Sequence, residues 1–275
     1  MVKVTDKNYY LGEKLAEKIK LSSQRCQNNL DAVLVVDGDE GFGKTTISFQ
    51  IAYYASYLLG RNFDHTNVFF NLDKMIEFGK NNSKQVIVWD EAALGGLSEE
   101  WNSIAQKKLL KFVMIARKKN HFLVMNIPKF FKLREYLILD RAIGLVHVYS
   151  PDQITRGRLA YYTKKAKENL FYDWKRSKKR NYKLYYSFRE VFTKFIPIDE
   201  EKYDKIKDEA IENFDKNDER ELYVKYIQYK LSTVPGLTND EIAEHCNRSE
   251  RTIRSWKNHA KKHPDCLKFS KKQYY

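Results

Sequence analysis

The chain has 275 residues, of which 43% are hydrophobic and 31% are charged, so it is long enough for one medium-sized folded domain plus an appendage. Its net charge of +14 points to a polyanionic partner, nucleic acid before membrane, with a lysine-rich solvated surface as the alternative. No apolar run could span a bilayer, no signal-peptide pattern opens the chain, and three cysteines without metal-ligand spacing argue against a disulfide framework. We therefore expect a soluble, cytoplasmic protein with no membrane role.

The first 150 residues alternate short apolar runs with helical patterns. Strands that alternate with helices predict an α/β fold with a parallel sheet and helices on both of its faces. The predicted strands span residues 32–36, 68–70, 85–89, 122–126 and 143–149. The predicted helices span residues 10–29, 45–59, 72–79 and 99–119.

Residues 38–45 read GDEGFGKT and match the phosphate-binding pattern G-x-x-x-x-G-K-[ST] at every fixed position. The glycines let backbone N–H groups surround phosphates, Lys44 places a positive charge at the β- and γ-phosphates, and the Thr45 hydroxyl binds Mg²⁺. A predicted strand precedes this P-loop and a helix follows it, as the motif requires. The residues predicted to bind ATP are Gly38, Gly41, Gly43, Lys44, Thr45 and Thr46.

Two acids, Asp90 and Glu91, follow the apolar run 85–89. An acid at the end of a buried strand holds Mg²⁺, so Thr45 and Asp90 form the predicted Mg²⁺ site. Glu91 is predicted to orient and deprotonate the attacking water; a helix-start or loop acid is the alternative. A strand and helix between the P-loop helix and this strand are typical of ATPases with a catalytic glutamate. The pattern thus predicts an additional-strand, catalytic-glutamate (RecA-like) P-loop NTPase rather than a kinase.

Asn126 ends the strand that we expect beside the strand of Asp90. Its amide is predicted to contact the γ-phosphate or the attacking water, and a plain strand-end cap is the alternative. The predicted catalytic residues are therefore Lys44, Glu91 and Asn126. An arginine finger could come from a neighbouring subunit, and Arg141 is preferred. The arginines considered for this role are Arg117, Arg134, Arg141, Arg156 and Arg158.

Residues 237–256 resemble a helix-turn-helix. Thr238 and Glu241 form a capping box, Asn247 suits the turn, and Ser249 caps a second helix. The alternative is a helical docking or oligomerisation module with a basic face. The residues predicted to contact DNA are Arg251, Arg254, Ser255, Lys257, Asn258 and Lys261.

Charge is distributed in blocks after residue 150. Residues 156–194 hold 13 basic and 3 acidic side chains, whereas residues 199–221 hold 5 basic and 11 acidic ones. Segments 158–162 and 169–174 are rich in aromatic residues and predict a basic β-hairpin, which suits either nucleic-acid tracking or packing on the sheet. The predicted domains are an N-terminal helical segment (1–30), a P-loop ATPase domain that includes this hairpin near 156–175 (31–197), an acidic linker or helix (198–221) and a helix-turn-helix domain (222–275).

The P-loop, the run VIVWDE at 86–91 with its two acids and the stretch ARKKNHFLVMNIP at 116–128 together resemble a known group. Over about residues 30–175 the chain resembles the FtsK/HerA and zonula-occludens-toxin-like P-loop ATPases of phages, plasmids and other mobile elements. The resemblance implies an ATP-driven DNA motor in a prokaryotic host cell, acting as a homo-oligomer and often a hexameric ring. The absent transmembrane segment and the added helix-turn-helix depart from that group, and they favour a cytosolic DNA transaction over export.

The leading hypothesis is a DNA-stimulated ATPase that moves or remodels duplex DNA in packaging, segregation or replication. One alternative is a helicase loader or replication initiator that uses ATP as an assembly switch. Another is a regulator whose nucleotide state gates the helix-turn-helix. The predicted cofactors are ATP and Mg²⁺, and the predicted partners are duplex DNA and further copies of the chain.

Overall fold

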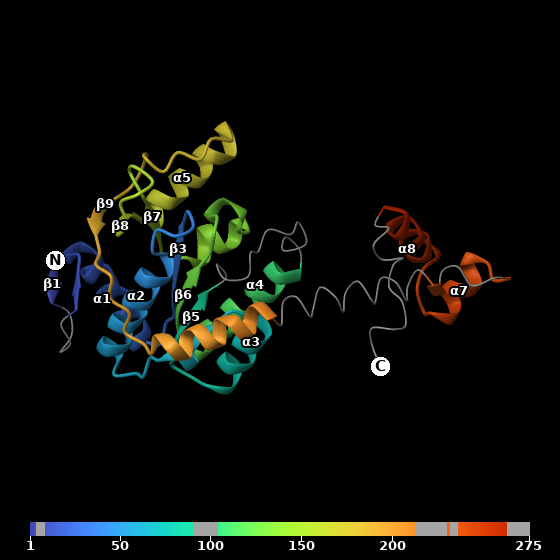
Figure 1. The fold of residues 1–275 in the computed structure, drawn as a ribbon, viewed down its shortest axis with the longest axis horizontal. Helices are drawn as coiled ribbons and strands as arrows, with labels where there is room; N and C mark the ends of the chain where they lie inside the picture. The colour runs from blue at the N-terminus through green and yellow to red at the C-terminus, as the bar shows by residue number, and fades with distance from the viewer. Residues whose placement is uncertain (4–8, 91–103, 213–229, 232–235, 263–275) are drawn as a thin grey trace. The chain divides into compact units, whose positions relative to one another are not determined.

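The computed structural model describes residues 1–3, 9–90, 104–212, 230–231 and 236–262, which belong to two compact units, Met1–Ala210 and Ile211–Tyr275 (Figure 1). None of the helices in these ranges has both the length and the apolar composition that crossing a membrane requires. Cys26 and Cys246 are free thiols, and Cys266 lies outside the described residues.

A sheet of seven strands runs through the first unit in the order β4-β5-β6-β3-β7-β8-β9. The pairs from β4 to β7 are parallel, whereas β8 runs antiparallel to β7 and β9 antiparallel to β8. The sheet strands are β3 (Ala32–Gly38), β4 (Val68–Phe69), β5 (Val86–Asp90), β6 (Phe122–Asn126), β7 (Gly144–Tyr149), β8 (Arg158–Thr163) and β9 (Phe188–Val191). A separate antiparallel pair joins β1 (Val2–Lys3) to β2 (Tyr10–Leu11).

Helices cover both faces of this sheet, as the alternation of strands and helices predicts. The α-helices of the first unit are α1 (Glu13–Gln27), α2 (Lys44–Leu59), α3 (Leu72–Asn81), α4 (Ile104–Lys119) and α5 (Lys164–Ser177), and residues 200–212 are also helical. Shorter helical turns are η1 (His65–Asn67), η4 (Phe130–Lys132) and η5 (Leu137–Arg141).

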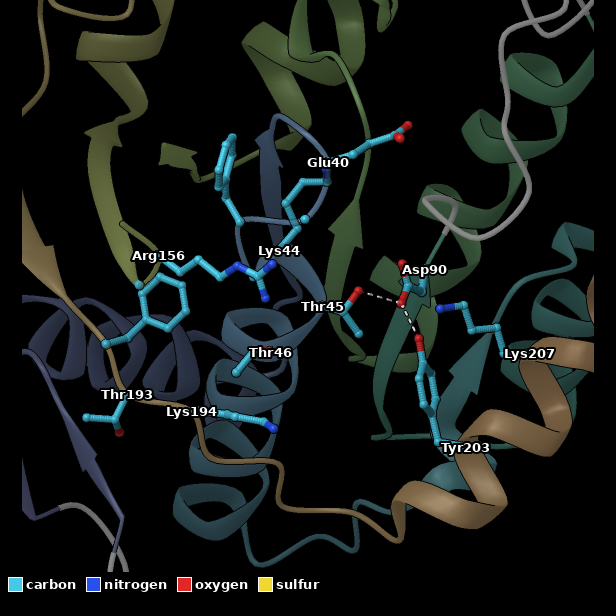
Figure 2. A pocket seen from close by; sticks show the side chains of 15 residues that line it. Glu40, Lys44, Thr45, Thr46, Asp90, Arg156, Thr193, Lys194, Tyr203 and Lys207 are labelled. Carbon is cyan, nitrogen blue, oxygen red and sulfur yellow. Dashed lines mark hydrogen bonds between the residues drawn. The ribbon is translucent and has the colours of Figure 1, made fainter. Parts of the chain in front are cut away.

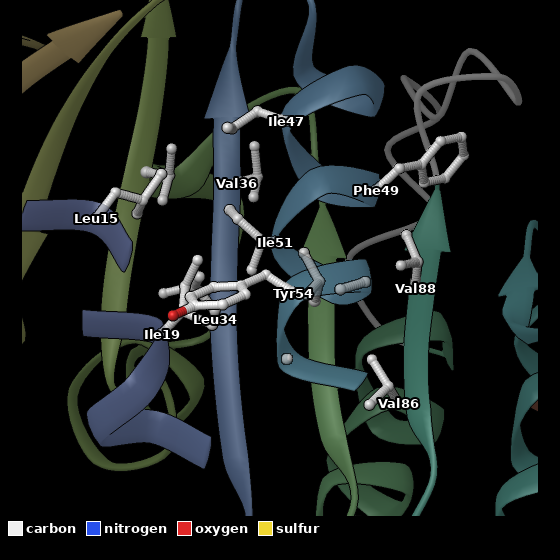
Figure 3. Packing of buried hydrophobic residues seen from close by; sticks show 14 of the residues in the cluster. Leu15, Ile19, Leu34, Val36, Ile47, Phe49, Ile51, Tyr54, Val86 and Val88 are labelled. Carbon is white, nitrogen blue, oxygen red and sulfur yellow. The ribbon is translucent and has the colours of Figure 1, made fainter. Parts of the chain in front are cut away.

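The strands bury both of their faces, so the unit has two apolar cores. Leu34 and Val36 of β3 belong to the core beneath α1 and α2, and Figure 3 shows Ile19 of α1 and Ile51 of α2 meeting them there. Val33 and Val35 point the opposite way, into the core beneath α3, α4 and α5. Successive side chains of a strand alternate between faces, which explains why the central strands read as continuous apolar runs.

The predicted β-hairpin near residues 156–175 is wrong in its second half. Segment 158–162 does form a strand, within β8, but segment 169–174 lies inside α5. Ala166, Leu170 and Phe171 recur at helical spacing and are buried against the sheet. A helix can bury this stripe in one face, and that tertiary packing outweighs the strand preference of the aromatic residues. The next partner of β8 is β9, which comes later in the chain.

Two helices that flank the central strands in sequence, α1 and the helix 200–212, contribute to the same core as β3. Leu15 and Ile19 of α1 and Tyr203 of the helix 200–212 are buried in the cluster that contains Val36. Both helices therefore belong to the folded unit that carries the P-loop.

The second unit contains α7 (Asn239–His245) and α8 (Glu250–Lys262). The predicted capping box is present, because the Thr238 and Glu241 side chains each accept a backbone N–H of the other residue. Asn247, in the turn, has φ 49°, the left-handed conformation that asparagine tolerates. Ile242, Ala243 and Ile253 form a small core, with Cys246 and Trp256 packed against it. Two short helices thus meet across a tight turn.

Candidate functional site

A pocket of about 590 Å³ lies where the carboxyl ends of β3 and β5 meet the start of α2 (Figure 2). Ligands of parallel α/β sheets bind at this edge. The P-loop forms one wall of the pocket, from Glu40 to Thr46. From outside the P-loop the lining includes Asp90, Arg156, Phe192, Lys194, Tyr203 and Lys207.

The P-loop backbone is shaped to receive an anion. Gly43 is the N-cap of α2 at φ 102°, in the left-handed region that favours glycine, and no side chain caps the helix. The first N–H groups of α2 are therefore left for a ligand, and the helix dipole favours negative charge there. Of the predicted ATP ligands, Gly43, Lys44, Thr45, Thr46 and Gly41 line the pocket, while Gly38 ends β3.

Lys44 is held within the loop that it serves. Its ammonium donates to the carbonyl oxygens of Gly38 at 2.8 Å and Asp39 at 2.9 Å, and its side chain is almost fully buried. Burial lowers the pKa of Lys44, because desolvation disfavours the charged form. The two carbonyl oxygens compensate the buried ammonium.

Thr45, Asp90 and Asn126 form one hydrogen-bonded group. The Thr45 hydroxyl donates to Asp90 Oδ2 at 3.0 Å, and the Asn126 amide donates to Asp90 Oδ1 at 2.8 Å and to Thr45 Oγ1 at 3.3 Å. This follows from the sheet: β6 lies between β3 and β5, so Asn126 stands opposite Asp90 in register. The expected neighbourhood of Asn126 and Asp90 is confirmed.

This group suits a magnesium ion. A threonine hydroxyl and a carboxylate are hard oxygen ligands of the kind that Mg²⁺ prefers, and Mg²⁺ keeps several waters when it binds beside phosphates. Asn126 Oδ1 is buried and has no hydrogen-bond partner among the described residues. Buried polar atoms are nearly always paired, so this oxygen has the capacity to accept a hydrogen bond from a metal-bound or attacking water. Thr45 and Asp90 are the residues that would hold the ion.

Asp37, one residue before the P-loop, secures the end of β3. Its buried carboxylate accepts hydrogen bonds from the Phe130 backbone N–H at 3.2 Å and from the Tyr182 hydroxyl, and it pairs with His147 Nδ1 at 2.9 Å. The rings of His147 and Tyr182 stack with their centroids 3.6 Å apart. These contacts hold the strand end from which the phosphate loop departs.

The part of the sequence that contains these site residues matches a known family. The family model described as nSTAND3, novel STAND NTPase 3, matches residues 22–173, a little over half of the chain. The chain belongs to this family. An nSTAND3 NTPase acts on a nucleotide, and the match spans the P-loop, Asp90 and Asn126. No curated protein matches the sequence significantly.

Tyr203 enters the nSTAND3 pocket from the helix 200–212, which lies beyond the matched residues. Its hydroxyl donates to Asp90 Oδ2 at 3.0 Å, the oxygen that also receives the Thr45 hydroxyl (Figure 2). Its ring packs against Phe49 and Phe70. Burial, followed by the negative charge of Asp90, raises the pKa of Tyr203 well above its usual value. Lys207, one turn later, also lines the pocket.

Sequence reasoning missed Tyr203, Lys207, Phe192 and Lys194 as site residues. Tyr203 and Lys207 are four residues apart, a helical spacing, but they lie in a segment whose acidic charge suggests a linker. Nothing in the spacing of Phe192 or Lys194 relates them to a P-loop 150 residues earlier in the chain. Only their approach in space connects them to it.

Arg141 does not approach the phosphate loop. Its guanidinium pairs with Asp31 and donates to the Val113 carbonyl oxygen at 3.0 Å, and its side chain is 11% exposed. Asp31 precedes β3, so this contact lies at the edge of the sheet opposite to the P-loop. The ion pair gives Arg141 a structural contact within its own chain, and its role as an arginine finger for a neighbouring subunit stays a prediction. Glu91 lies outside the described residues.

The predicted DNA-contacting residues belong to the second unit, on α8. Arg251, Ser255 and Asn258 are exposed, as expected of an outward face. Arg254 is also exposed but pairs with Glu250, and the Lys257 ammonium donates to Asn239 Oδ1 at 2.6 Å, which ties α8 to α7. The side chain of Lys261 lies outside the described residues.

Proposed function

We propose that this chain is a Mg²⁺-dependent ATPase that binds duplex DNA through α7 and α8 and uses hydrolysis to move or remodel DNA of a mobile element. The observation that carries the ATPase half is the contact of Thr45 and Asn126 with Asp90 beside the P-loop. The strand order supports the additional-strand, catalytic-glutamate type, since β6 separates β3 from β5 and β4 lies beyond β5.

Each residue has a definite part in the proposed hydrolysis. The α2 N–H groups and Lys44 bind the phosphates, and Thr45 and Asp90 would hold a Mg²⁺ ion, which would supply charge neutralisation for the phosphates when bound. The water oxygen bonds to the γ-phosphorus as the bond to the bridging oxygen breaks, and the electron pair stays on ADP. Glu91 takes the proton of that water, and Asn126 Oδ1 accepts its second hydrogen bond. ADP, phosphate and a proton leave.

The DNA half rests on charge and on α8. Residues 248–272 carry 9 basic and 2 acidic side chains, and the exposed face of α8 includes Arg251, Ser255 and Asn258. Arginine and asparagine are the side chains that read base edges, and a helix of this kind fits the major groove. A motor of this kind would act as a homo-oligomer, and a hexameric ring of subunits could enclose the duplex.

The turnover of a DNA motor depends on DNA length. We therefore expect the rate of ATP hydrolysis to rise at least about 10-fold with long non-specific duplex and little with a short one. A 10-fold rise corresponds to about 1.4 kcal/mol in the activation free energy. The Arg251→Ala/Arg254→Ala variant should lose this stimulation and keep the basal rate. Steady-state phosphate release with circular, linear and short duplexes measures both. Lys14→Ala/Lys20→Ala removes the same charge from α1 and should behave as the wild type. Turnover that ignores DNA length while binding selects one short sequence contradicts the motor.

A second function, a nucleotide-gated DNA-binding protein, is favoured by the contact between Tyr203 and Asp90. A carboxylate oxygen accepts about two hydrogen bonds, and Asp90 Oδ2 already receives Thr45 and Tyr203. Hydrated Mg²⁺ held at Asp90 would therefore compete with the Tyr203 hydroxyl for this oxygen. In the sequence, the helix 200–212 precedes the segment that leads to α7 and α8, so displacement of Tyr203 would pass nucleotide state toward the DNA-binding helices.

Tyr203→Phe tests this gating. The variant keeps the ring contacts with Phe49 and Phe70 but loses a hydrogen bond to a carboxylate, so we expect the free energy of unfolding without Mg²⁺ to fall by about 1–3 kcal/mol. Mg²⁺ with a non-hydrolysable ATP analogue should bind more tightly, and DNA affinity should respond less to nucleotide. Chemical denaturation measures the stability, calorimetry the nucleotide affinity and DNA titrations the response to nucleotide. Tyr172→Phe, which removes a hydroxyl from an exposed tyrosine of α5, is the control. Wild-type DNA affinity that is equal with and without nucleotide excludes gating.

A further inference from the structure

Arg156 is a cation of the nucleotide pocket that comes from outside the P-loop. It lies on the connection between β7 and β8 and lines the pocket together with Lys44 and Thr45. Figure 2 shows its guanidinium extended across the pocket, toward Thr45. The side chain is exposed, and within the described residues it makes no ion pair. A charged group in this position faces whatever anion the pocket holds.

The loop that carries Arg156 is ordered by its own hydrogen bonds. The Asp152 carboxylate accepts the backbone N–H groups of Ile154 at 3.0 Å and Thr155 at 2.7 Å, and also the Thr155 hydroxyl at 2.6 Å. The Ser150 hydroxyl donates to it at 3.0 Å. These bonds, led by that of the Thr155 hydroxyl, hold the pKa of Asp152 well below its usual value. The chain thus reaches Arg156 in a defined conformation.

The same loop is built against the P-loop. Gly157 has φ 77°, and a Cβ there would lie 2.4 Å from the Phe192 carbonyl oxygen, while the Phe192 N–H donates to the Gly157 carbonyl oxygen at 2.8 Å. The Phe192 ring in turn lies 3.2 Å from where a Cβ on Gly43 would be. Backbone contact and ring contact therefore connect Arg156 to the glycine that opens α2.

A guanidinium at this place has a clear chemical use. It is always charged and forms paired N–H bonds to phosphate oxygens, and negative charge spreads over the γ-phosphoryl and bridging oxygens as the phosphorus–oxygen bond breaks. Lys44, Lys194 and Lys207 also line the pocket, but an ammonium lacks the paired N–H geometry of a guanidinium. An arginine in the same subunit supplies this geometry without requiring a neighbouring copy.

We propose that Arg156 is a catalytic residue that acts within its own subunit, binding the γ-phosphate of ATP and stabilising the charge that develops on it. The proposal rests on the ATPase function proposed above and deepens it, since it replaces the predicted finger Arg141 with a residue of the same chain's pocket. Arg158 supplies the contrast. It begins β8 two residues later and is exposed, but it does not line the pocket.

The first experiment measures binding. A γ-phosphate contact predicts that Arg156→Ala weakens binding of a non-hydrolysable ATP analogue with Mg²⁺ about 10-fold or more, with ADP affinity unchanged. Arg156→Lys keeps the charge but loses the paired N–H geometry, so its affinity for the ATP analogue should lie between those of the wild type and Arg156→Ala. Arg158→Ala should match the wild type. Titration calorimetry gives each dissociation constant, and thermal unfolding confirms that each variant folds.

The second experiment measures turnover. Arg156→Ala should lower kcat for ATP about 100-fold or more at saturating nucleotide, as loss of one preorganised transition-state donor does. The lower kcat should persist in dilute protein and should not be rescued by added Glu91→Gln protein, because a residue acting within its own subunit cannot be replaced by a neighbour. Asp152→Ala, which loosens the loop but keeps the guanidinium, should lower kcat less than Arg156→Ala does.

The outcomes separate this inference from the ATPase function. Wild-type protein that neither binds nor hydrolyses ATP overturns the function itself. Wild-type hydrolysis together with an Arg156→Ala protein that equals Arg158→Ala overturns only the role of Arg156. An equal loss of ADP and ATP-analogue affinity overturns the γ-phosphate assignment, and rescue by the Glu91→Gln protein overturns action within one subunit.

Discussion

Lys44→Ala is expected to abolish ATP hydrolysis, with kcat/KM reduced at least about 100-fold, because the variant loses the cation that meets the β- and γ-phosphates. The ammonium also binds the Gly38 and Asp39 carbonyl oxygens, and the buried Gly38 oxygen loses this partner when the ammonium is removed. Unsatisfied buried acceptors cost about 1–3 kcal/mol, so the variant should also unfold at lower denaturant. Phosphate release, nucleotide titration and urea unfolding measure the three effects.

The two effects of Lys44→Ala can be told apart. Lys20→Ala removes a lysine from the exposed side of α1, away from the pocket residues, and should leave hydrolysis and nucleotide binding unchanged. If Lys44→Ala stays folded at the assay temperature, its lost activity reports the site and not the fold. A folded Lys44→Ala protein that hydrolyses ATP at the wild-type rate would mean that this P-loop is not the catalytic nucleotide site.

Glu91→Gln is expected to bind ATP without hydrolysing it. Glu91 follows Asp90, the last residue of β5, and its assigned role is to take the proton of the attacking water. Glutamine keeps the size of the side chain but cannot accept that proton, so kcat should fall about 100- to 10,000-fold. ATP affinity should be retained, since Lys44, Thr45 and Asp90 are unchanged. Single-turnover hydrolysis and nucleotide retention on gel filtration measure the two properties.

Glu40→Gln is the matched control for Glu91→Gln. Glu40 is an exposed acid of the P-loop that also lines the pocket, and its replacement makes the same chemical change. We expect Glu40→Gln to hydrolyse ATP within a few-fold of the wild-type rate. Undiminished turnover by Glu91→Gln would remove Glu91 from the mechanism and leave the general base to another group.

The neighbours of the P-loop show where sequence reasoning succeeds and where it stops. Asp90 and Asn126 each end a short apolar run, and parallel strands bring their carboxyl ends to one edge, so a local pattern is enough to predict that they meet. Arg141 precedes β7, which runs parallel to β3, so the same rule places it at the opposite edge, where it pairs with Asp31. The local pattern does not predict that Arg156, on the connection after β7, lines the P-loop pocket, because that depends on the path of the connection.

The misassigned hairpin has a related cause. Phe171 and Trp174 favour a strand by residue type, but α5 buries its apolar stripe against the sheet, and the strand that pairs with β8 is β9. Aromatic residues suit either structure when one face is buried, so only the available partner decides between them.

The sequence by itself determined the P-loop, the strand ends at Asp90 and Asn126, and the capped helix pair that begins at Thr238, because each depends on residues a few positions apart and on a geometry that the motif itself imposes. The tertiary structure alone decided that Tyr203 donates to Asp90, that Phe192 lies against Gly43 and that Arg156 faces the phosphate site. These contacts join segments up to 150 residues apart. The contacts form because the helix 200–212 packs in the core and β9 pairs with β8, which brings these segments to the P-loop. That packing depends on the whole core, so no local sequence pattern records it.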